Sequence, residues 1–286
     1  MSIRLIIDTC ADLTNDDLDK SVYILPITVT IDGKEYIPFT NLSNEEFYSL
    51  QKTAKSFPHT SQVPLKVLYD TFTKCLDNKE DVLAIFMGSA HSGTFNTAMM
   101  VKSTIESERG AEQASHIHII DSKNVTFPYG ALVFEAFKMI RENKMTVSQI
   151  EDRINYLVPR VHMRAFIDDL IYLKKGGRIS GVTAVFGNLL NFKVVIKTGE
   201  NKIEPTDKVR GLQKALLCII ETANKEDIDY SLPCYIGHTN IPERAEKLYE
   251  LTLEKTNLKP KQVISIGPTV GTHVGEGSTG LCWFVK

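Results

Sequence analysis

The stretch Val82-Leu83-Ala84-Ile85-Phe86-Met87-Gly88-Ser89-Ala90-His91-Ser92-Gly93-Thr94-Phe95 joins an apolar run to a polar turn and then to a helical pattern. Its first six residues form a short, uninterrupted apolar run, which is typical of a strand buried within a sheet. Downstream, Ala98, Val101 and Ile105 recur at helical spacing over residues 93–108. The stretch therefore predicts a strand followed by a helix, which is the repeating unit of an α/β sheet.

The same alternation extends along the chain in both directions. Strands are expected at 3–7, 82–87, 117–120, 162–167, 193–197, 233–236, 263–266 and 284–285. Helices are expected at 44–54, 64–76, 93–108, 146–159, 170–173, 182–190, 209–223 and 242–253. We predict an α/β fold with a mostly parallel sheet and flanking helices in residues 1–159. A second α/β domain, residues 160–286, is expected to pack against it, with a ligand site at the junction.

Composition excludes several classes of protein. Of the 286 residues, 43% are hydrophobic and 24% charged, and the net charge is −2, which argues against a nucleic-acid-binding protein. No apolar run approaches the roughly 18 residues that span a bilayer, and the N-terminus reads as a strand instead of a signal peptide. The five cysteines are scattered without CxxC spacing. We therefore expect reduced thiols, no metal site and a cytoplasmic location.

Four polar clusters follow expected strands, where α/β sheets place their ligands. They are residues 8–13, 59–62, 88–95 and 267–280. Ser92 is expected at or near the N-cap of its helix, where backbone N–H groups and the helix dipole favour a carboxylate or a phosphate. For the first three clusters, turn formation and helix capping are the structural alternatives.

The fourth cluster brackets His273 with five glycines. We expect a flexible loop that directs this histidine at a ligand, the alternative being a tight hairpin with a solvated side chain. The G-x-G-x-x-G pattern at 275–280 is not a dinucleotide fingerprint, because no helix follows it. Two roles fit Arg178, which follows two glycines: a residue at a helix C-terminus, or a contact to an anion. The sequence favours neither. His116 and His118 share a strand face, but we expect no metal there.

Together these clusters resemble the DegV family of bacterial fatty-acid-binding proteins, which serve as the B subunit of fatty acid kinase. The matching segments occur in family order and span nearly the whole chain, as one DegV domain over about residues 3–284. They are Asp8-Thr9-Cys10-Ala11-Asp12-Leu13, Thr60-Ser61-Gln62, Ser92-Gly93-Thr94-Phe95, the run from Leu170 to Ile179, which contains Lys174-Lys175-Gly176-Gly177-Arg178, and Gly267-Pro268-Thr269-Val270-Gly271-Thr272-His273-Val274-Gly275.

The resemblance implies that a long-chain fatty acid is buried between two domains, with its carboxylate held by Thr60, Ser92 and His273. Secondary contacts are expected from Ser61, Gly93, Thr94, Arg178 and Thr272. It further implies that the protein is not itself an enzyme and needs no cofactor. It would present the fatty acid to a separate ATP-dependent kinase subunit, which makes an acyl phosphate for phospholipid synthesis, and would contact the membrane transiently.

The physical chemistry of a buried carboxylate agrees with this prediction. A buried carboxylate must be paired or hydrogen-bonded, and two hydroxyls with a protonatable histidine meet that need. Glu276 departs from the family's usual Gly-Pro-Gly and brings a negative charge near the proposed anion site. The alternative is a serine hydrolase or acyltransferase with Ser92 as nucleophile, His273 as base and Asp8 orienting it, although the nucleophile elbow is missing. A nucleotide-binding module is a third, weaker alternative.

Overall fold

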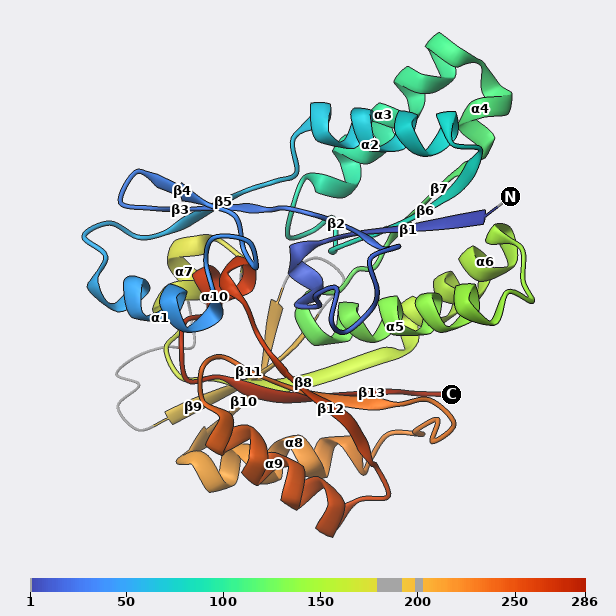
Figure 1. Cartoon of the computed structure of the whole chain (residues 1–286). Coiled ribbons are helices and arrows are strands. Elements are labelled where there is room, and N and C mark those ends of the chain that lie inside the picture. The colour runs from blue at the N-terminus through green and yellow to red at the C-terminus, as the bar shows by residue number, and fades with distance from the viewer. Residues whose placement is uncertain (1, 179–191, 199–202) are drawn as a thin grey trace.

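The structure is a computed structural model that describes residues 2–178, 192–198 and 203–286 (Figure 1). The helix expected at 182–190 lies outside the described residues. The first sheet is parallel throughout, in the order β2-β1-β6-β7. Its strands are β1 (Ser2–Asp8), β2 (Tyr23–Leu25), β6 (Glu80–Phe86) and β7 (Ile117–Asp121). The central strands β1 and β6 are buried on both faces, which explains their uninterrupted apolar runs.

Helices cover both faces of this sheet, as Figure 1 shows. On one face lie α2 (Leu65–Asp77), α3 (Thr94–Arg109) and α4 (Ala111–Ser115), and on the other lie α5 (Thr126–Glu142) and α6 (Val147–Leu157). In α3, the predicted stripe of Ala98, Val101 and Ile105 is fully buried. Helix α6 begins at a capping box in which Thr146 and Gln149 satisfy each other's backbone N–H groups.

The second sheet has six strands in the order β10-β9-β8-β13-β11-β12 and is antiparallel except for the pair β11–β12. Its strands are β8 (Val161–Ile167), β9 (Phe192–Thr198), β10 (Ile203–Arg210), β11 (Cys234–His238), β12 (Pro260–Ser265) and β13 (Thr279–Phe284). A short 3-10 turn, Val158–Arg160, leads into β8. Helices α8 (Leu212–Ala223) and α9 (Pro242–Lys255) cover the outer face, where Trp283 is fully buried.

Helix α5 lies between the two sheets and contributes to one core with both of them (Figure 1). All eleven residues from Thr126 to Ala136 are buried. A helix that is buried on every side has no polar stripe. For that reason no amphipathic pattern in residues 126–136 indicates a helix. The predicted α/β class, with a helix-flanked parallel sheet and a second sheet domain, is confirmed, whereas the division at residue 159 stays a prediction.

A smaller antiparallel sheet, in the order β4-β3-β5, was not predicted. Its strands are β3 (Thr28–Ile31), β4 (Lys34–Tyr36) and β5 (His59–Ser61), and helix α1 (Asn44–Thr53) packs beside it through Phe47 and Tyr48. Helix α1, expected at 44–54, starts after its N-cap Ser43, which forms a capping box with Glu46. These strands have three or four residues each, too few for a clear alternating pattern.

Two expectations for the second half are wrong. The helix expected from residue 209 begins at Leu212, because residues up to Arg210 pair as an edge strand with β9. The glycine-rich tail is not a loop, because Pro268–Val274 forms helix α10. Gly271 lets α10 approach α1, since a Cβ there would lie 2.7 Å from Tyr48 Oη. Gly275 ends the helix with a φ of +73°, in the region that favours glycine.

Candidate functional site

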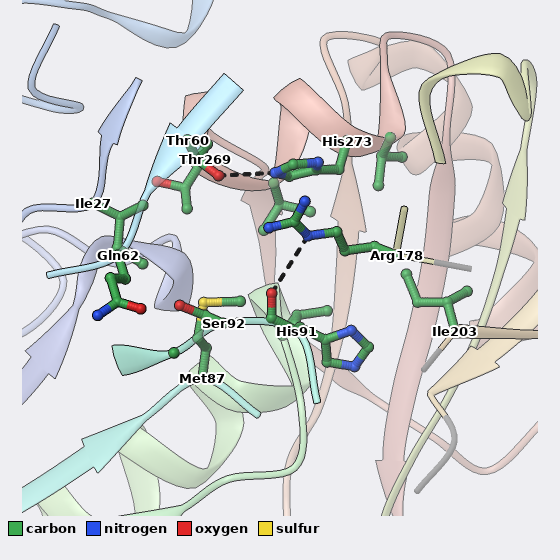
Figure 2. A pocket seen from close by; sticks show the side chains of 14 residues that line it. Ile27, Thr60, Gln62, Met87, His91, Ser92, Arg178, Ile203, Thr269 and His273 are labelled. Atoms are coloured by element: carbon green, nitrogen blue, oxygen red, sulfur yellow. Dashed lines mark hydrogen bonds between the residues drawn. The ribbon is translucent and has the colours of Figure 1, made fainter. Parts of the chain in front are cut away.

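A cavity of about 220 Å³ lies beyond the carboxyl ends of β2, β6 and β7, because Ile27, Met87 and Val125 follow these strands and line it. This is the edge at which parallel sheets place ligands. Figure 2 shows side chains from several distant segments converging on it. Half of the lining is apolar and half carries polar groups. The lining residues are Ile27, Thr60, Gln62, Met87, His91, Ser92, Gly93, Val125, Arg178, Ile203, Thr269, Val270, His273 and Val274. The three residues predicted to hold a carboxylate are all among them.

Thr60 and His273 are in direct contact. Thr60 Oγ1 lies 2.9 Å from Nε2 of His273 (Figure 2). The other ring nitrogen, Nδ1, is buried and has no hydrogen-bond partner among the described residues. We assign the ring proton to Nε2, because an N–H at Nδ1 would be buried without an acceptor. The imidazole then donates to Thr60, whose own hydroxyl proton is available to a ligand in the cavity.

The histidine is neutral at pH 7. Burial, with the positive charge of Arg178 and the nearby His91, lowers the pKa of His273 to about 4. The ring of the ligand-free protein is therefore uncharged near neutral pH, and its protonation beside a bound carboxylate stays a prediction. His273 instead acts as a hydrogen-bond donor that orients Thr60.

Ser92 lies one residue before the N-cap of α3, which is Gly93. Its Oγ accepts a hydrogen bond from the backbone N–H of Thr94 at 3.3 Å and lies 3.1 Å from Thr94 Oγ1. Thr94 Oγ1 in turn accepts from the backbone N–H of Val63. When Thr94 donates to Ser92, the Ser92 proton is free for a ligand. The predicted position near the helix N-terminus is confirmed.

Arg178 supplies the positive charge of the cavity wall. Its guanidinium is half-buried. Its Nη1 donates to the backbone oxygen of Gly176, and its Nε donates to that of His91, the bond that Figure 2 shows. No carboxylate in the described part of the chain forms an ion pair with it. Burial lowers the pKa of Arg178 from its ordinary value, but a guanidinium stays protonated in proteins. The cavity therefore has a charge that an anionic ligand would neutralise.

The predicted secondary residues divide into two groups. Gly93 and Arg178 line the cavity. Thr94 does not line the cavity but contacts Ser92 through its hydroxyl. Thr272 is buried, and its hydroxyl donates to the backbone oxygen of Pro268. Ser61 is exposed, because neighbouring residues of strand β5 point to opposite sides. Sequence reasoning missed Ile27, Met87, Val125 and Ile203, which make the apolar wall and lie in no shared motif.

The first predicted cluster, residues 8–13, supports the site from below. Asp12 Oδ1 accepts from the backbone N–H of Gly267 at 2.8 Å, at the start of α10. Thr9 Oγ1 lies 3.1 Å from Oγ1 of Thr269, a cavity residue. Asp8 accepts from the backbone N–H groups of Cys10 and Met87. Asp12 and Thr9 therefore hold the helix that carries His273, and Asp8 holds the backbone of Met87. None of the three lines the cavity.

Glu276 has partners away from the cavity. Its Oε2 lies 2.7 Å from Nζ of Lys52 in α1, and its Oε1 accepts from Nδ2 of Asn240 at 2.6 Å. Glu276 is not among the residues that line the cavity. The negative charge therefore fastens the C-terminal end of α10 to α1 and is neutralised there.

The groups of a hydrolytic triad are not assembled. His273 bonds to Thr60, Ser92 bonds to Thr94, and Asp8 bonds to backbone N–H groups. Asp8 therefore does not orient His273, as the alternative hypothesis required.

His116 pairs with Asp81 and His118 with Glu151, and no group of three or more metal-ligating side chains occurs among the described residues. No helix in the described residues is long and apolar enough to cross a membrane.

The fold and the cavity define an α/β protein of three sheets with a candidate small-molecule site, where hydroxyl groups and an apolar wall line the same cavity. The protein-family model described as "Uncharacterised protein, DegV family" matches residues 2–286 of this chain. The chain belongs to the DegV family.

Known relatives match over the whole chain. A DegV domain-containing protein of Caldanaerobacter subterraneus is 30% identical over 285 residues, covering 98% of this chain and 97% of that protein. The structure of a fatty acid binding DegV family protein from Streptococcus agalactiae has a TM-score of 0.85 at 31% identity, covering 100% of this chain and 99% of that one. The structure of DegV from Bacillus subtilis, described as a fatty acid binding protein, has a TM-score of 0.84 at 26% identity, with both chains fully covered.

Proposed function

We propose that this protein binds a long-chain fatty acid, with the carboxylate held by Thr60, Ser92 and His273. The observation that carries the proposal is the convergence of these three side chains on one cavity that also has an apolar wall. When His273 donates to Thr60 and Thr94 donates to Ser92, each of these two hydroxyls has a proton free for the ligand. Hydrogen bonds to a charged acceptor are the stronger kind. His273 holds Thr60 in the donating orientation.

Arg178 provides the counter-charge in this proposal. A carboxylate moved out of water costs several kcal/mol unless it is paired or hydrogen-bonded. The Arg178 guanidinium lines the cavity without an acidic partner in the described part of the chain, so a bound carboxylate would neutralise it. The alkyl chain would gain about 0.8 kcal/mol for each methylene it buries against the apolar wall.

We further propose that the protein is a carrier and not an enzyme. It would present its fatty acid to a separate ATP-dependent kinase that forms the acyl phosphate, and would contact the membrane transiently to exchange lipid.

The site would lie between a first domain, residues 1–159, and a second, residues 160–286. All five cysteines are unpaired thiols, in keeping with a reducing cytoplasm.

The first test is the ligand itself. The purified protein is denatured, its organic extract is analysed by mass spectrometry, and binding of added palmitate and oleate is measured. We expect a long-chain fatty acid in the extract and saturable binding of both probes. An empty extract together with no binding of either probe would refute the proposal.

The carrier role has its own test. The protein is loaded with oleate and incubated with ATP, with and without a fatty acid kinase ATP-binding subunit. Acyl phosphate is expected only in the presence of that subunit. Acyl phosphate made by the protein alone, or hydrolysis of oleate esters that disappears in Ser92→Ala, would show it to be an enzyme.

A further inference from the structure

Gln62 spans the two segments that carry the proposed headgroup donors. It follows strand β5, which carries Thr60, and its side chain reaches the start of α3, which follows Ser92. Its Nε2 donates to Oγ1 of Thr97 at 2.7 Å. Thr97 is buried, whereas Gln62 is exposed and lines the cavity (Figure 2).

The same side chain explains the glycine at position 93. A Cβ on residue 93 would lie 1.9 Å from Oε1 of Gln62, which no real contact allows. Gly93 has a φ of −75° and a ψ of −4°, a conformation that any residue adopts. The backbone would therefore accept another residue here, but a side chain at position 93 would have to push aside the Gln62 amide, which is the end of a flexible, exposed side chain.

We propose that Gln62 is a positioning residue that sets the separation between the hydroxyls of Thr60 and Ser92; this inference rests on the proposed function. The two hydroxyls come from different segments, and the Val63 N–H bond to Thr94 is a second link between them. Hydrogen bonds weaken steeply when geometry departs from its optimum. A binding site must therefore hold its donors to within about 0.5 Å. The amide of Gln62, fixed by Thr97 and seated over Gly93, holds the end of β5 against the start of α3.

A double-mutant cycle tests this arrangement. Oleate affinity is measured for the unchanged protein, Gln62→Ala, Gly93→Ala and the double variant. Each single change is expected to weaken oleate binding about fivefold, the effect of losing one hydrogen bond. Gly93→Ala acts by displacing the Gln62 amide, so the double variant should be no weaker than either single one. Thr97→Val, which removes the acceptor at constant shape, should give the same loss.

A second ligand separates positioning from general loosening. Oleyl alcohol has the same chain as oleate without the carboxylate, so misplaced hydroxyls should lower the ratio of oleate to alcohol affinity about fivefold. A loosened fold would weaken both ligands alike and leave that ratio unchanged. Gln262→Ala is the matched control, because Gln262 also donates a side-chain hydrogen bond, to Asp17 at 2.8 Å, but does not line the cavity.

The outcomes distinguish the inference from the function beneath it. If the unchanged protein binds neither oleate nor palmitate, the proposed function fails. If it binds oleate but Gln62→Ala has unchanged affinity, or the two single losses multiply in the double variant, the positioning role of Gln62 is overturned and the proposed function stands.

Discussion

His273 Nε2 and Thr60 Oγ1 are separated by 2.9 Å, although the two residues are 213 positions apart in sequence. The bond joins a strand of the smallest sheet to the helix that precedes the last strand of the largest. It also assigns different tasks to the two side chains: the histidine orients, and the threonine donates. The predictions that follow depend on that division.

Replacing Thr60 by valine keeps the shape of the side chain and removes its hydroxyl. We expect fatty-acid affinity to fall roughly tenfold or more, as for a lost hydrogen bond to a charged group. Thr60→Ser should restore most of the affinity, since the hydroxyl returns. Fluorescence or calorimetric titration with oleate measures both. Ser61→Ala, a neighbouring but exposed hydroxyl, is the control, and an equal loss there would argue against the assignment.

Ser92→Ala is expected to weaken oleate binding by a similar factor, with little change in melting temperature. The Ser92 side chain is partly exposed and, within the described part of the chain, its hydroxyl bonds to Thr94 in the same turn, so we expect little dependence of the fold on it. Titration and thermal unfolding are measured on the same samples. Retained affinity in both Ser92→Ala and Thr60→Val would mean that the carboxylate is held elsewhere.

The pKa of His273, about 4, gives a pH prediction. The ring stays neutral from pH 6.5 to pH 8, so titration of His273 should contribute no pH dependence to oleate affinity in that range. Because Arg178 lowers this pKa, Arg178→Gln should raise it toward 6.5. NMR titration of the imidazole in the ligand-free protein measures both values. A His273 pKa above 6 in the unchanged protein would contradict the assignment.

The buried carboxyl of Asp12 predicts that the stability of the fold decreases as the pH rises. Burial raises the pKa of Asp12 to about 7 from an ordinary value of 3.8, so the folded state holds this proton more tightly than the unfolded state. Stability from this group is complete below about pH 4 and is lost as the pH rises toward about 7. Asp12→Asn keeps an oxygen for Gly267 and cannot ionise. Denaturant unfolding across pH 4–8 should show a smaller decline in the variant than in the unchanged protein; equal declines would be inconsistent with the raised pKa.

Glu276→Gln tests whether the charge in the tail affects the ligand. We expect unchanged oleate affinity, because Glu276 faces Lys52 and Asn240 instead of the cavity. The free energy of unfolding should fall by less than about 1 kcal/mol, since the Lys52 pair is partly exposed. Chemical denaturation and oleate titration measure the two effects. Tighter oleate binding in the variant would show that Glu276 repels the carboxylate.

Sequence patterns predicted the elements that have two distinct faces or clear caps. The helices expected at 44–54 and 146–159 form and begin at the caps Ser43 and Thr146, and the strand before Gly88 is buried as its apolar run implies. The three side chains that the motifs assigned to the carboxylate, Thr60, Ser92 and His273, line one cavity. Whether they hold a ligand stays a prediction.

The rest depends on contacts that no local pattern records. Helix α5 is buried on all sides along its first eleven residues and so carries no helical stripe. Helix α10 forms in a glycine-rich segment because Asp12 accepts from the N–H of Gly267 and Gln51 donates to the backbone oxygen of Gly271. These partners lie far away in sequence, and tertiary contacts override weak local propensity.

The position of β13 has a consequence for how the protein is made. This strand follows every other strand of its sheet in the chain, yet it lies between β8 and β11. While the chain is being synthesised, those two strands have unpaired edges until β13 emerges, and unpaired edges are prone to aggregation. Helix α10, with His273, emerges just before β13. A nascent chain therefore completes the cavity lining only after Val274 has emerged, and ligand binding would report that helix α10 has reached its place.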